Sequence, residues 1–363
     1  MKAGIITCHD VYNFGSSLQA LALQEFLNNH GIKTEIINYK PSYLYKLIDL
    51  MEVDSPKWKK NVLSRWCYRI YTFPFKLRWI VKYIKFKWFN KHFLILSSHK
   101  YTELEINKEK FDYDVYICGS DQIWNSKNFS CGEDSAFFLK FVNKGVKIAY
   151  AASFGGTRVS KKGEENIKRY LPQFRAVSVR EKSGLDVLEK YRIEATHVID
   201  PVFLLDKNYW RNIAVMISKL PKTYILVYGY DNSEELSKAV QYYSRKTQLP
   251  VISIKTRVFQ NAGPLEFIAL IDNAAMVITT SFHAVAFSVI LHTPFVACKT
   301  GNEDLFERIS NLLEITELNG RKYSELFKKN DWETESIDFN VSDNRIRECV
   351  EQSKKFLLTA VKE

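Results

Sequence analysis

Short apolar runs alternate with polar turns and helical patterns along the chain. Residues 3–8 form an apolar run, 9–17 a polar turn, and 18–27 carry apolar residues at helical spacing up to Gly31. A glycine in that place is typical of a helix C-terminus. A second apolar run covers 34–39. This pattern predicts a βαβ unit, the opening of an open α/β sheet whose ligands bind at the carboxyl ends of its strands.

The same alternation of strand and helix patterns occurs in two successive parts of the chain. A chain of 363 residues exceeds the usual size of one hydrophobic core, so two domains are expected. We place the boundary between Asp206 and Pro221, which gives Rossmann-like domains at 1–206 and 207–342 and a final helix at 343–363 that packs back across both. The expected strands are 114–118, 147–152, 176–179 and 198–199, then 224–230, 250–254 and 276–278, with helices at 161–171 and 234–246.

Residues from 41 to about 100 interrupt this rhythm with a basic, aromatic insertion. The chain carries a net charge of +11, and the segment 57–91 alone holds eleven Lys or Arg and no Asp or Glu. The remainder is therefore neutral, which disfavours a generic nucleic-acid binder. Tryptophans among cations are typical of a helix at an anionic membrane surface. Aromatics that pack into the neighbouring domain beside solvated lysines explain the pattern equally well.

Composition indicates a globular cytosolic protein, with 46% hydrophobic and 26% charged residues. Residues 1–7 run straight into a strand pattern without a signal-peptide core, and no uncharged apolar run is long enough to span a bilayer. Six scattered cysteines without a C-x-x-C pair or a His/Cys cluster favour a reducing compartment and disfavour a structural zinc site. We expect a cytoplasmic protein, peripheral at the inner face of the cell membrane if the basic segment binds lipid.

The candidate chemistry lies where apolar strands end. His283 falls in the first turn of a helix that begins at Ser281, where free N–H groups and the helix dipole favour anions and disfavour imidazolium. Arg180 follows another strand directly, and a guanidinium with an imidazole suits a small anion that has phosphate and carboxylate groups. Other polar residues expected at this rim are Asn13, Gln19, Asp121, Glu181, Lys299 and Arg308.

Common nucleotide-binding and nucleophile motifs do not occur in the chain. The loop 13–17 is neither a G-x-G-x-x-G nor a P-loop with its lysine. A G-x-S-x-G elbow is missing, and no cysteine lies near a candidate base. These observations disfavour dinucleotide binding, serine-hydrolase chemistry and cysteine-nucleophile chemistry.

Taken together, the motifs resemble those of the bacterial polysaccharide pyruvyl transferase family. The resemblance implies two Rossmann-like domains facing across a cleft, in a glycosyltransferase-B-like arrangement. It also implies transfer of pyruvate from phosphoenolpyruvate onto two sugar hydroxyls as a cyclic ketal, with Arg180 and His283 holding the donor. The matching stretches are Asn13-Phe14-Gly15-Ser16-Ser17-Leu18-Gln19-Ala20, Cys118-Gly119-Ser120-Asp121-Gln122-Ile123-Trp124-Asn125, Ala151-Ala152-Ser153-Phe154-Gly155, Ser178-Val179-Arg180-Glu181, Asp200-Pro201 and Ser281-Phe282-His283-Ala284.

The chain departs from the family pattern at one position. Many members carry an arginine two residues before the histidine, where this chain has Ser281. We then expect Arg308 or Lys299 to supply the second cation that binds the donor. A different donor is the alternative explanation.

The expected roles follow from side-chain chemistry. His283 is the expected acid/base, and Arg180 the residue that stabilises charge on the leaving group. Asp121 and Glu181 are candidate acids or acceptors of sugar hydroxyls, whereas Asn13 and Gln19 fit acceptor binding and loop anchoring equally well.

The sequence therefore predicts a ketal pyruvyltransferase of surface polysaccharide assembly. It would use phosphoenolpyruvate as co-substrate, a lipid-linked sugar as acceptor, and no metal, cofactor or nucleic acid. A nucleotide-sugar glycosyltransferase is the first alternative, because a two-domain cleft serves both activities. A non-enzymatic, membrane-associated assembly factor that acts through 57–91 is the second.

Overall fold

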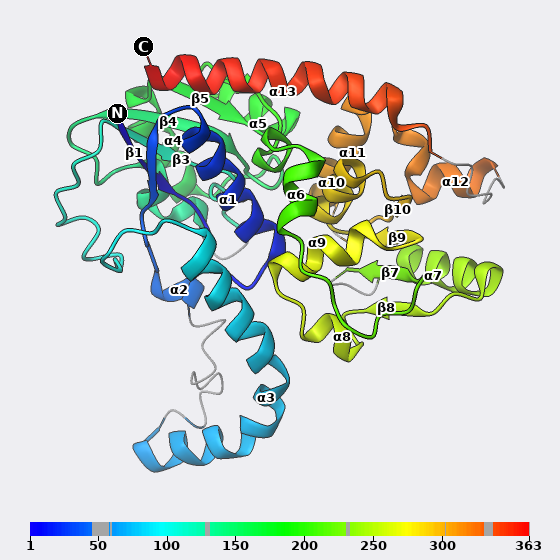
Figure 1. Cartoon of the computed structure of the whole chain (residues 1–363). Coiled ribbons are helices and arrows are strands. Elements are labelled where there is room, and N and C mark those ends of the chain that lie inside the picture. The colour runs from blue at the N-terminus through cyan, green and yellow to red at the C-terminus, as the bar shows by residue number, and fades with distance from the viewer. Residues whose placement is uncertain are drawn as a thin grey trace.

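The strands of the protein form two parallel sheets, as seen in a computed structural model (Figure 1). It describes residues 1–45, 58, 60–127, 131–229, 233–301, 303–329 and 337–362, with only the backbone described at 74–78, 305, 328 and 329. The first sheet has the order β2-β1-β3-β4-β5-β6, and the second has the order β10-β9-β7-β8. The strands are β1 (Lys2–Ile6), β2 (Lys33–Ile36), β3 (Val115–Cys118), β4 (Val146–Ala152), β5 (Ala176–Val179), β6 (Thr196–His197), β7 (Ile225–Tyr228), β8 (Val251–Ser253), β9 (Met276–Thr279) and β10 (Phe295–Ala297).

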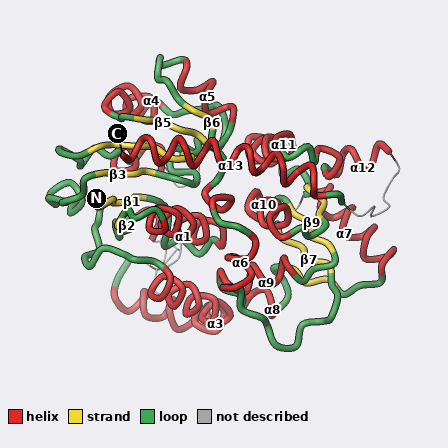
Figure 2. The backbone as a smooth tube through the Cα atoms, turned by 45° about the horizontal axis from the view of Figure 1, so that its top comes forward, coloured by secondary structure: helices red, strands yellow, loops and turns green. Residues whose placement is uncertain are grey.

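Helices cover both faces of each sheet (Figure 2), as buried parallel strands require. In the N-terminal domain these are α1 (Phe14–Asn29), α4 (Lys161–Tyr170) and α5 (Lys182–Glu189). The chain then passes through α6 (Lys207–Ile213) into the C-terminal domain. That domain contains α7 (Glu234–Thr247), α8 (Arg257–Gln260), α9 (Pro264–Asp272), α10 (Phe282–Leu291), α11 (Glu303–Ile315) and α12 (Tyr323–Lys329).

One hydrophobic core is continuous between the two domains. Side chains alternate along β7, so Leu226 and Tyr228 face this shared core while Ile225 and Val227 face a separate cluster beneath α7. Phe14 of α1 stacks on Phe267 of α9 with ring centroids 4.5 Å apart. The chain thus folds as two Rossmann-like domains in the glycosyltransferase-B arrangement, and their shared core sets where the strand ends meet.

The C-terminal helix α13 (Phe339–Lys362) lies across both domains (Figure 1). Asp343 pairs with His292 of the C-terminal domain at 2.8 Å. Farther along, Ser353 Oγ accepts a hydrogen bond of 2.9 Å from the backbone N–H of Ile199. The sequence predicted a strand at 198–199, but the last strand of the sheet is β6 at Thr196–His197. The N–H group of Ile199 donates to α13 and is therefore not available to extend the sheet.

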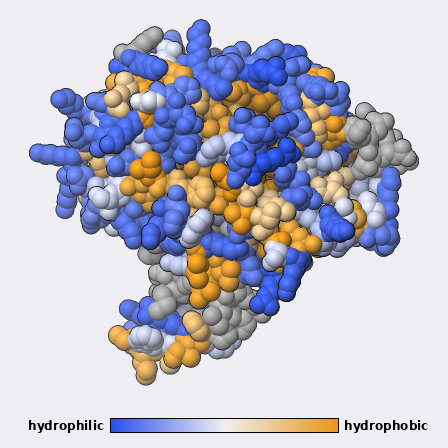
Figure 3. All heavy atoms as spheres, viewed as in Figure 1, coloured by the Kyte–Doolittle hydropathy of each residue, from blue (hydrophilic) through white to orange (hydrophobic). Residues whose placement is uncertain are grey.

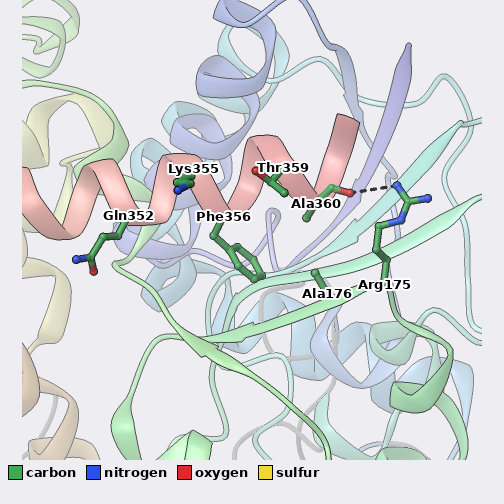
Figure 4. Close-up of a pocket in the computed structure, with 7 residues that line it drawn as sticks. All are labelled: Arg175, Ala176, Gln352, Lys355, Phe356, Thr359 and Ala360. Carbon is green, nitrogen blue, oxygen red and sulfur yellow. Dashed lines mark hydrogen bonds between the residues drawn. The ribbon is translucent and has the colours of Figure 1, made fainter. Parts of the chain in front are cut away.

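A surface pocket of about 440 Å³ lies beneath the C-terminal part of α13 (Figure 4). Arg175, at its edge, donates a hydrogen bond of 3.4 Å to the carbonyl oxygen of Ala360. Arg175 precedes β5, whereas Arg180 follows it. The pocket is therefore at the opposite end of the strand from the candidate chemistry.

The basic insertion contains α2 (Ser42–Tyr45) and the long α3 (Val62–Phe93). Asn61 caps α3 by accepting a hydrogen bond of 2.7 Å from the N–H of Ser64. The helix changes direction along its length (Figure 1), and its sequence carries Pro74, a residue that bends helices. Lys57 and Lys59 of the predicted basic segment lie outside the described residues. Within the described residues, no helix is both long enough and apolar enough to cross a membrane.

Candidate functional site

The candidate site lies where the strand order of both sheets reverses. The reversal falls between β1 and β3 in the first sheet and between β7 and β9 in the second. Loops diverge at such a point and leave room for a ligand at the carboxyl ends of the strands. Gly15, after β1, lies against His283, after β9. The two reversal points therefore meet at the domain interface.

His283 is the second residue of α10 and is buried. Ser281 precedes the helix in an extended conformation, and its backbone N–H donates a hydrogen bond of 2.9 Å to Thr279 Oγ1. The imidazole packs so tightly on α1 that a Cβ atom built on Gly15 would lie 2.0 Å from Nδ1. The other ring nitrogen, Nε2, lies 3.7 Å from Oδ2 of Asp200. The sequence prediction for the strand, the turn and the helix start agrees with β9 and α10.

Arg180 leaves β5 at the same interface, and it is only 4% exposed. Its Nη1 donates a hydrogen bond of 2.6 Å to Asp200 Oδ2, and its Nη2 lies 3.6 Å from Glu181 Oε1. The guanidinium sits 4.5 Å from the ring centre of Phe282, which gives a cation–π contact between the domains.

Burial and ion pairing act in opposite directions on this pair. Burial would lower the pKa of Arg180, but Glu181 and Asp200 outweigh it, and the pKa is raised. Burial would raise the pKa of Asp200, yet His283 and Arg180 hold it well below its usual range. Both groups are therefore charged at neutral pH.

Arg308 of α11 brings a second guanidinium to the site. Burial, followed by repulsion from Arg180, lowers the pKa of Arg308 to about 10, so it remains charged at neutral pH. Lys299 is exposed, and its ammonium lies 5.8 Å from the ring centre of Phe306. Of the two cations predicted to replace the family arginine, Arg308 lies close to Arg180 and Asp200, whereas Lys299 is exposed beside α11.

Asp121 follows β3 and is buried at the other side of the interface. It adopts a left-handed backbone conformation with φ of 68°, which aspartate tolerates better than most residues. Ser16 Oγ donates a hydrogen bond to its Oδ2, and the N–H of Gln122 donates one of 2.8 Å to its Oδ1. The carboxylate is thus fixed between the two loops.

Asn13 and Gln19 anchor loops. The Asn13 side chain accepts hydrogen bonds from two backbone N–H groups in the first turn of α1, so it is the N-cap. Gln19 has no exposed surface; its Nε2 donates to Thr7 Oγ1 at 2.9 Å, and its Oε1 accepts from the N–H of Ser120 at 3.1 Å. This geometry supports loop anchoring over acceptor contact, because both ends of the Gln19 amide are occupied.

Several buried polar atoms at this interface have no hydrogen-bond partner. Buried donors without partners are costly and indicate a place that a ligand fills. The carboxylate of Asp200 already has hydrogen-bond donors, because it accepts from Arg180 and from the N–H of Val202 at 3.1 Å. The unpartnered atoms are Nε and Nη2 of Arg180, Nε of Arg308, Nε2 of His283 and Oε2 of Glu181. Donors outnumber acceptors, so the gap suits an anion bearing several oxygens.

Sequence reasoning missed three contributors to the site. Asp200 links Arg180 to His283; the sequence marked it by its place after an apolar pair and by Asp200-Pro201, one of the stretches that match the family, but gave it no role. Phe282 covers the guanidinium, and Gly15 leaves room for the imidazole. Both residues lie in motifs that match the family, but their contacts depend on how the two domains meet.

Comparisons with known proteins place the chain among its relatives. A search of curated proteins gives no match. Several solved structures resemble the chain. One is UDP-N-acetylglucosamine 2-epimerase from Neisseria meningitidis bound to UDP-GlcNAc, which is 10% identical to this chain. The similarity covers 99% of this chain and 100% of the epimerase chain, with a TM-score of 0.45. The epimerase from Rickettsia bellii is 12% identical over 99% of this chain and 96% of its own, also with a TM-score of 0.45. S. aureus TarM, in complex with UDP, is 11% identical over the full length of both chains with a TM-score of 0.45.

The family model for polysaccharide pyruvyl transferase matches residues 13–302. This range begins at the cap of α1 and extends beyond β10, so it contains His283, Arg180 and Asp200. Because the match covers most of its length, the chain belongs to the polysaccharide pyruvyl transferase family.

Proposed function

We propose that the protein transfers pyruvate from phosphoenolpyruvate onto two hydroxyls of a sugar as a cyclic ketal. The observation that carries the proposal is the set of unpartnered N–H donors of Arg180, Arg308 and His283 at the domain interface. Phosphoenolpyruvate bears a carboxylate and a phosphate on the same carbon, and two guanidinium groups bind such oxygens well. Family membership supports transfer of pyruvate but does not specify this donor.

In this mechanism Arg180 and Arg308 hold the donor and neutralise its charge. The methylene carbon of the donor gains a proton, which leaves an oxocarbenium-like centre at the neighbouring carbon. The first sugar hydroxyl adds there and gives its proton to the imidazole of His283. Phosphate then departs with the electron pair of its C–O bond, and the second hydroxyl closes the ring as its proton passes to the phosphate. The guanidinium groups stabilise the phosphate as its charge develops.

His283 is the acid/base of this sequence. Nδ1 packs against Gly15 of α1, so Nε2, which faces Asp200 and has no hydrogen-bond partner, is the nitrogen that exchanges protons with the substrates. The imidazole accepts the proton of the attacking hydroxyl and returns one to the methylene carbon. Such proton transfer typically contributes about 10²- to 10⁴-fold to the rate.

The acceptor side of the site is assigned to Glu181 and Asp121. Oε2 of Glu181 has no partner, whereas its Oε1 accepts a hydrogen bond from Ser153 Oγ. A carboxylate oxygen in that state accepts a sugar hydroxyl readily. Asp121 accepts a hydrogen bond from Ser16 and lies close enough to Arg180 and Arg308 to interact with both guanidinium groups. The acceptor in this proposal is a lipid-linked sugar, and no metal or cofactor takes part.

The proposal is tested by release of phosphate from phosphoenolpyruvate, with and without a glycolipid fraction from the producing cells. We expect release only when the acceptor is present, and its loss in His283→Ala and in Arg180→Ala. Unchanged release in His283→Ala would overturn the site assignment.

A nucleotide-sugar glycosyltransferase is the rival that this architecture also accommodates. Thermal denaturation of the free protein separates the two functions. Phosphoenolpyruvate should raise the melting temperature, and UDP should not. The opposite result would favour the rival.

A further inference from the structure

The two halves of helix α3 have different surroundings. In the C-terminal half, Phe86 and Phe89 are buried in the core that both domains share. Lys87 pairs with Asp10 at 2.9 Å, and Lys82 is buried with its ammonium 4.4 Å from the ring centre of Phe14. This half is therefore fixed to the body of the protein beside the candidate site.

The N-terminal half projects away from the body (Figure 1). Its large apolar side chains are exposed, and hydrophobic atoms show at its tip in Figure 3. At 100° per residue they fall within an arc of about 100° on the helix. The residues of this face are Val62, Leu63, Trp66, Ile70 and Phe73, each between 53% and 74% exposed. We call these five residues the arm face.

Such a face is unusual on a protein surface. Single exposed apolar residues are common, but a contiguous apolar stripe on a helix is a binding surface. Water would penalise the exposure of five large side chains, and within the described residues no element of the chain packs over them. A partner that supplies an apolar medium would remove this penalty.

Charge decides what kind of partner fits. Lys60, Arg65 and Arg69 flank the arm face, and the whole segment 57–91 contains no Asp or Glu. The Arg69 guanidinium lies 5.6 Å from the ring centre of Trp66, so cation and aromatic are presented together. Trp at the polar–apolar boundary with Arg and Lys beside it matches the headgroup region of an anionic bilayer.

A second copy of the chain fits less well. A symmetric dimer would place one arm face on the other, and each brings the same cations to the contact. The segment 57–91 carries no Asp or Glu, so it offers no carboxylate to pair with these cations across the contact. A lipid surface supplies anionic headgroups for the cations as well as the apolar medium.

We propose that the arm face docks the protein on an anionic membrane surface as an interfacial helix. The helix lies in the plane of the headgroups with Trp66, Ile70 and Phe73 inserted and the arginines at the phosphates. The C-terminal half of α3, fixed to the body, then holds the domain interface at a set distance from the lipid. This inference does not rest on the proposed function, because docking needs no turnover.

Co-sedimentation of the full chain with vesicles tests the proposal. Vesicles of phosphatidylcholine with about a third phosphatidylglycerol should bind the protein at low salt, and pure phosphatidylcholine should bind it at least about 10-fold more weakly. The triple variant Trp66→Ser, Ile70→Ser, Phe73→Ser should lose binding. Neutralisation by Lys60→Gln, Arg65→Gln and Arg69→Gln should weaken binding to anionic vesicles by about 10- to 100-fold.

A matched control removes apolar residues that are exposed elsewhere. The variant Leu104→Ser, Met216→Ser, Val341→Ser changes three exposed side chains away from α3 and should bind like the wild type. Circular dichroism and thermal melting must show that each variant is folded. Absent binding of the wild type at low salt would overturn the proposal, as would unchanged binding of the arm-face variant. A dimer in sedimentation velocity that the arm-face variant abolishes would establish a second copy as the partner and overturn it too.

Discussion

Nε2 of His283 lies 3.7 Å from Oδ2 of Asp200, across the boundary between the two domains. The same oxygen of Asp200 accepts a hydrogen bond from Arg180. One carboxylate therefore orients both the candidate acid/base and the candidate anion-binding residue. The contact exists only when the domains are assembled as seen here.

The first prediction concerns this carboxylate. Asp200→Asn should lower kcat on the order of 10²-fold or more, because His283 loses the carboxylate that faces its Nε2 and orients the ring. Steady-state kinetics with a saturating acceptor measures the effect, after thermal melting has shown that the variant is folded. Asp186→Asn, at an exposed carboxylate on α5, serves as the control and should leave kcat unchanged. Equal kcat in Asp200→Asn and wild type would contradict the role of Asp200.

The second prediction concerns the space that Gly15 leaves for the imidazole. Gly15→Ala places a methyl group 2.0 Å from Nδ1 of His283, so the ring must move. We expect a loss of kcat of at least about 10-fold with the overall fold retained. Gly320→Ala is the matched control, since a Cβ atom there meets nothing within 4 Å. Full activity in Gly15→Ala would show that the observed position of the ring is not the catalytic one.

The third prediction separates the two cations proposed to replace the family arginine. Arg308→Gln should raise the KM for phosphoenolpyruvate by about 10-fold or more, because the donor loses a charged partner. Lys299→Gln should change it little, because the ammonium lies outside the site. Steady-state kinetics at varied phosphoenolpyruvate measures KM in both variants, and calorimetric titration with the donor measures binding.

A rescue variant sharpens this comparison. The Ser281 side chain makes no capping hydrogen bond, so Ser281→Arg leaves the start of α10 intact. The double variant Arg308→Gln, Ser281→Arg should recover donor binding. A larger loss in Lys299→Gln than in Arg308→Gln would reverse the assignment.

The fourth prediction concerns the buried ammonium of Lys82. Burial lowers its pKa from 10.5 to about 8. Below pH 8 the ammonium is charged in both the folded and the unfolded protein, so its burial lowers the free energy of unfolding by the full amount. This cost shrinks as the pH rises and disappears above about 10.5. Lys82→Met should therefore raise the free energy of unfolding at pH 7 by about 1 to 3 kcal/mol, after the lost cation–π contact is offset.

Denaturant unfolding at several pH values measures this effect. The advantage of Lys82→Met over wild type should shrink between pH 8 and pH 10. Lys91→Met, at an exposed position on the same helix, should show no such trend. A Lys82→Met variant that is less stable than wild type at pH 7 would contradict the interpretation.

The sequence predicted the fold well because strand and helix periods are local. Alternation of apolar runs with helical patterns located β1, β3, β7 and β9, and the loop residues Arg180 and His283 at strand ends followed from it. The end of β6 was misplaced, since the N–H of Ile199 bonds to Ser353 of a helix far along the chain. No local pattern encodes such a contact.

The site was predicted only in part for the same reason. Arg180, Asp200 and Arg308 come from separate segments, and only the assembled domains bring them together. For the basic insertion, the sequence left membrane contact and packing equally open. The structure divides the segment: Phe86 and Phe89 pack in the core, and the arm face remains exposed.

Mass spectrometry of glycan intermediates tests the central claim most directly. Cells without the gene, cells with it, and cells complemented with His283→Ala are compared for a pyruvate-sized addition to a sugar. The account predicts the addition with the wild-type gene and its absence both without the gene and with His283→Ala. Identical glycan masses in all three would contradict pyruvyl transfer, and the addition in His283→Ala cells would contradict the site.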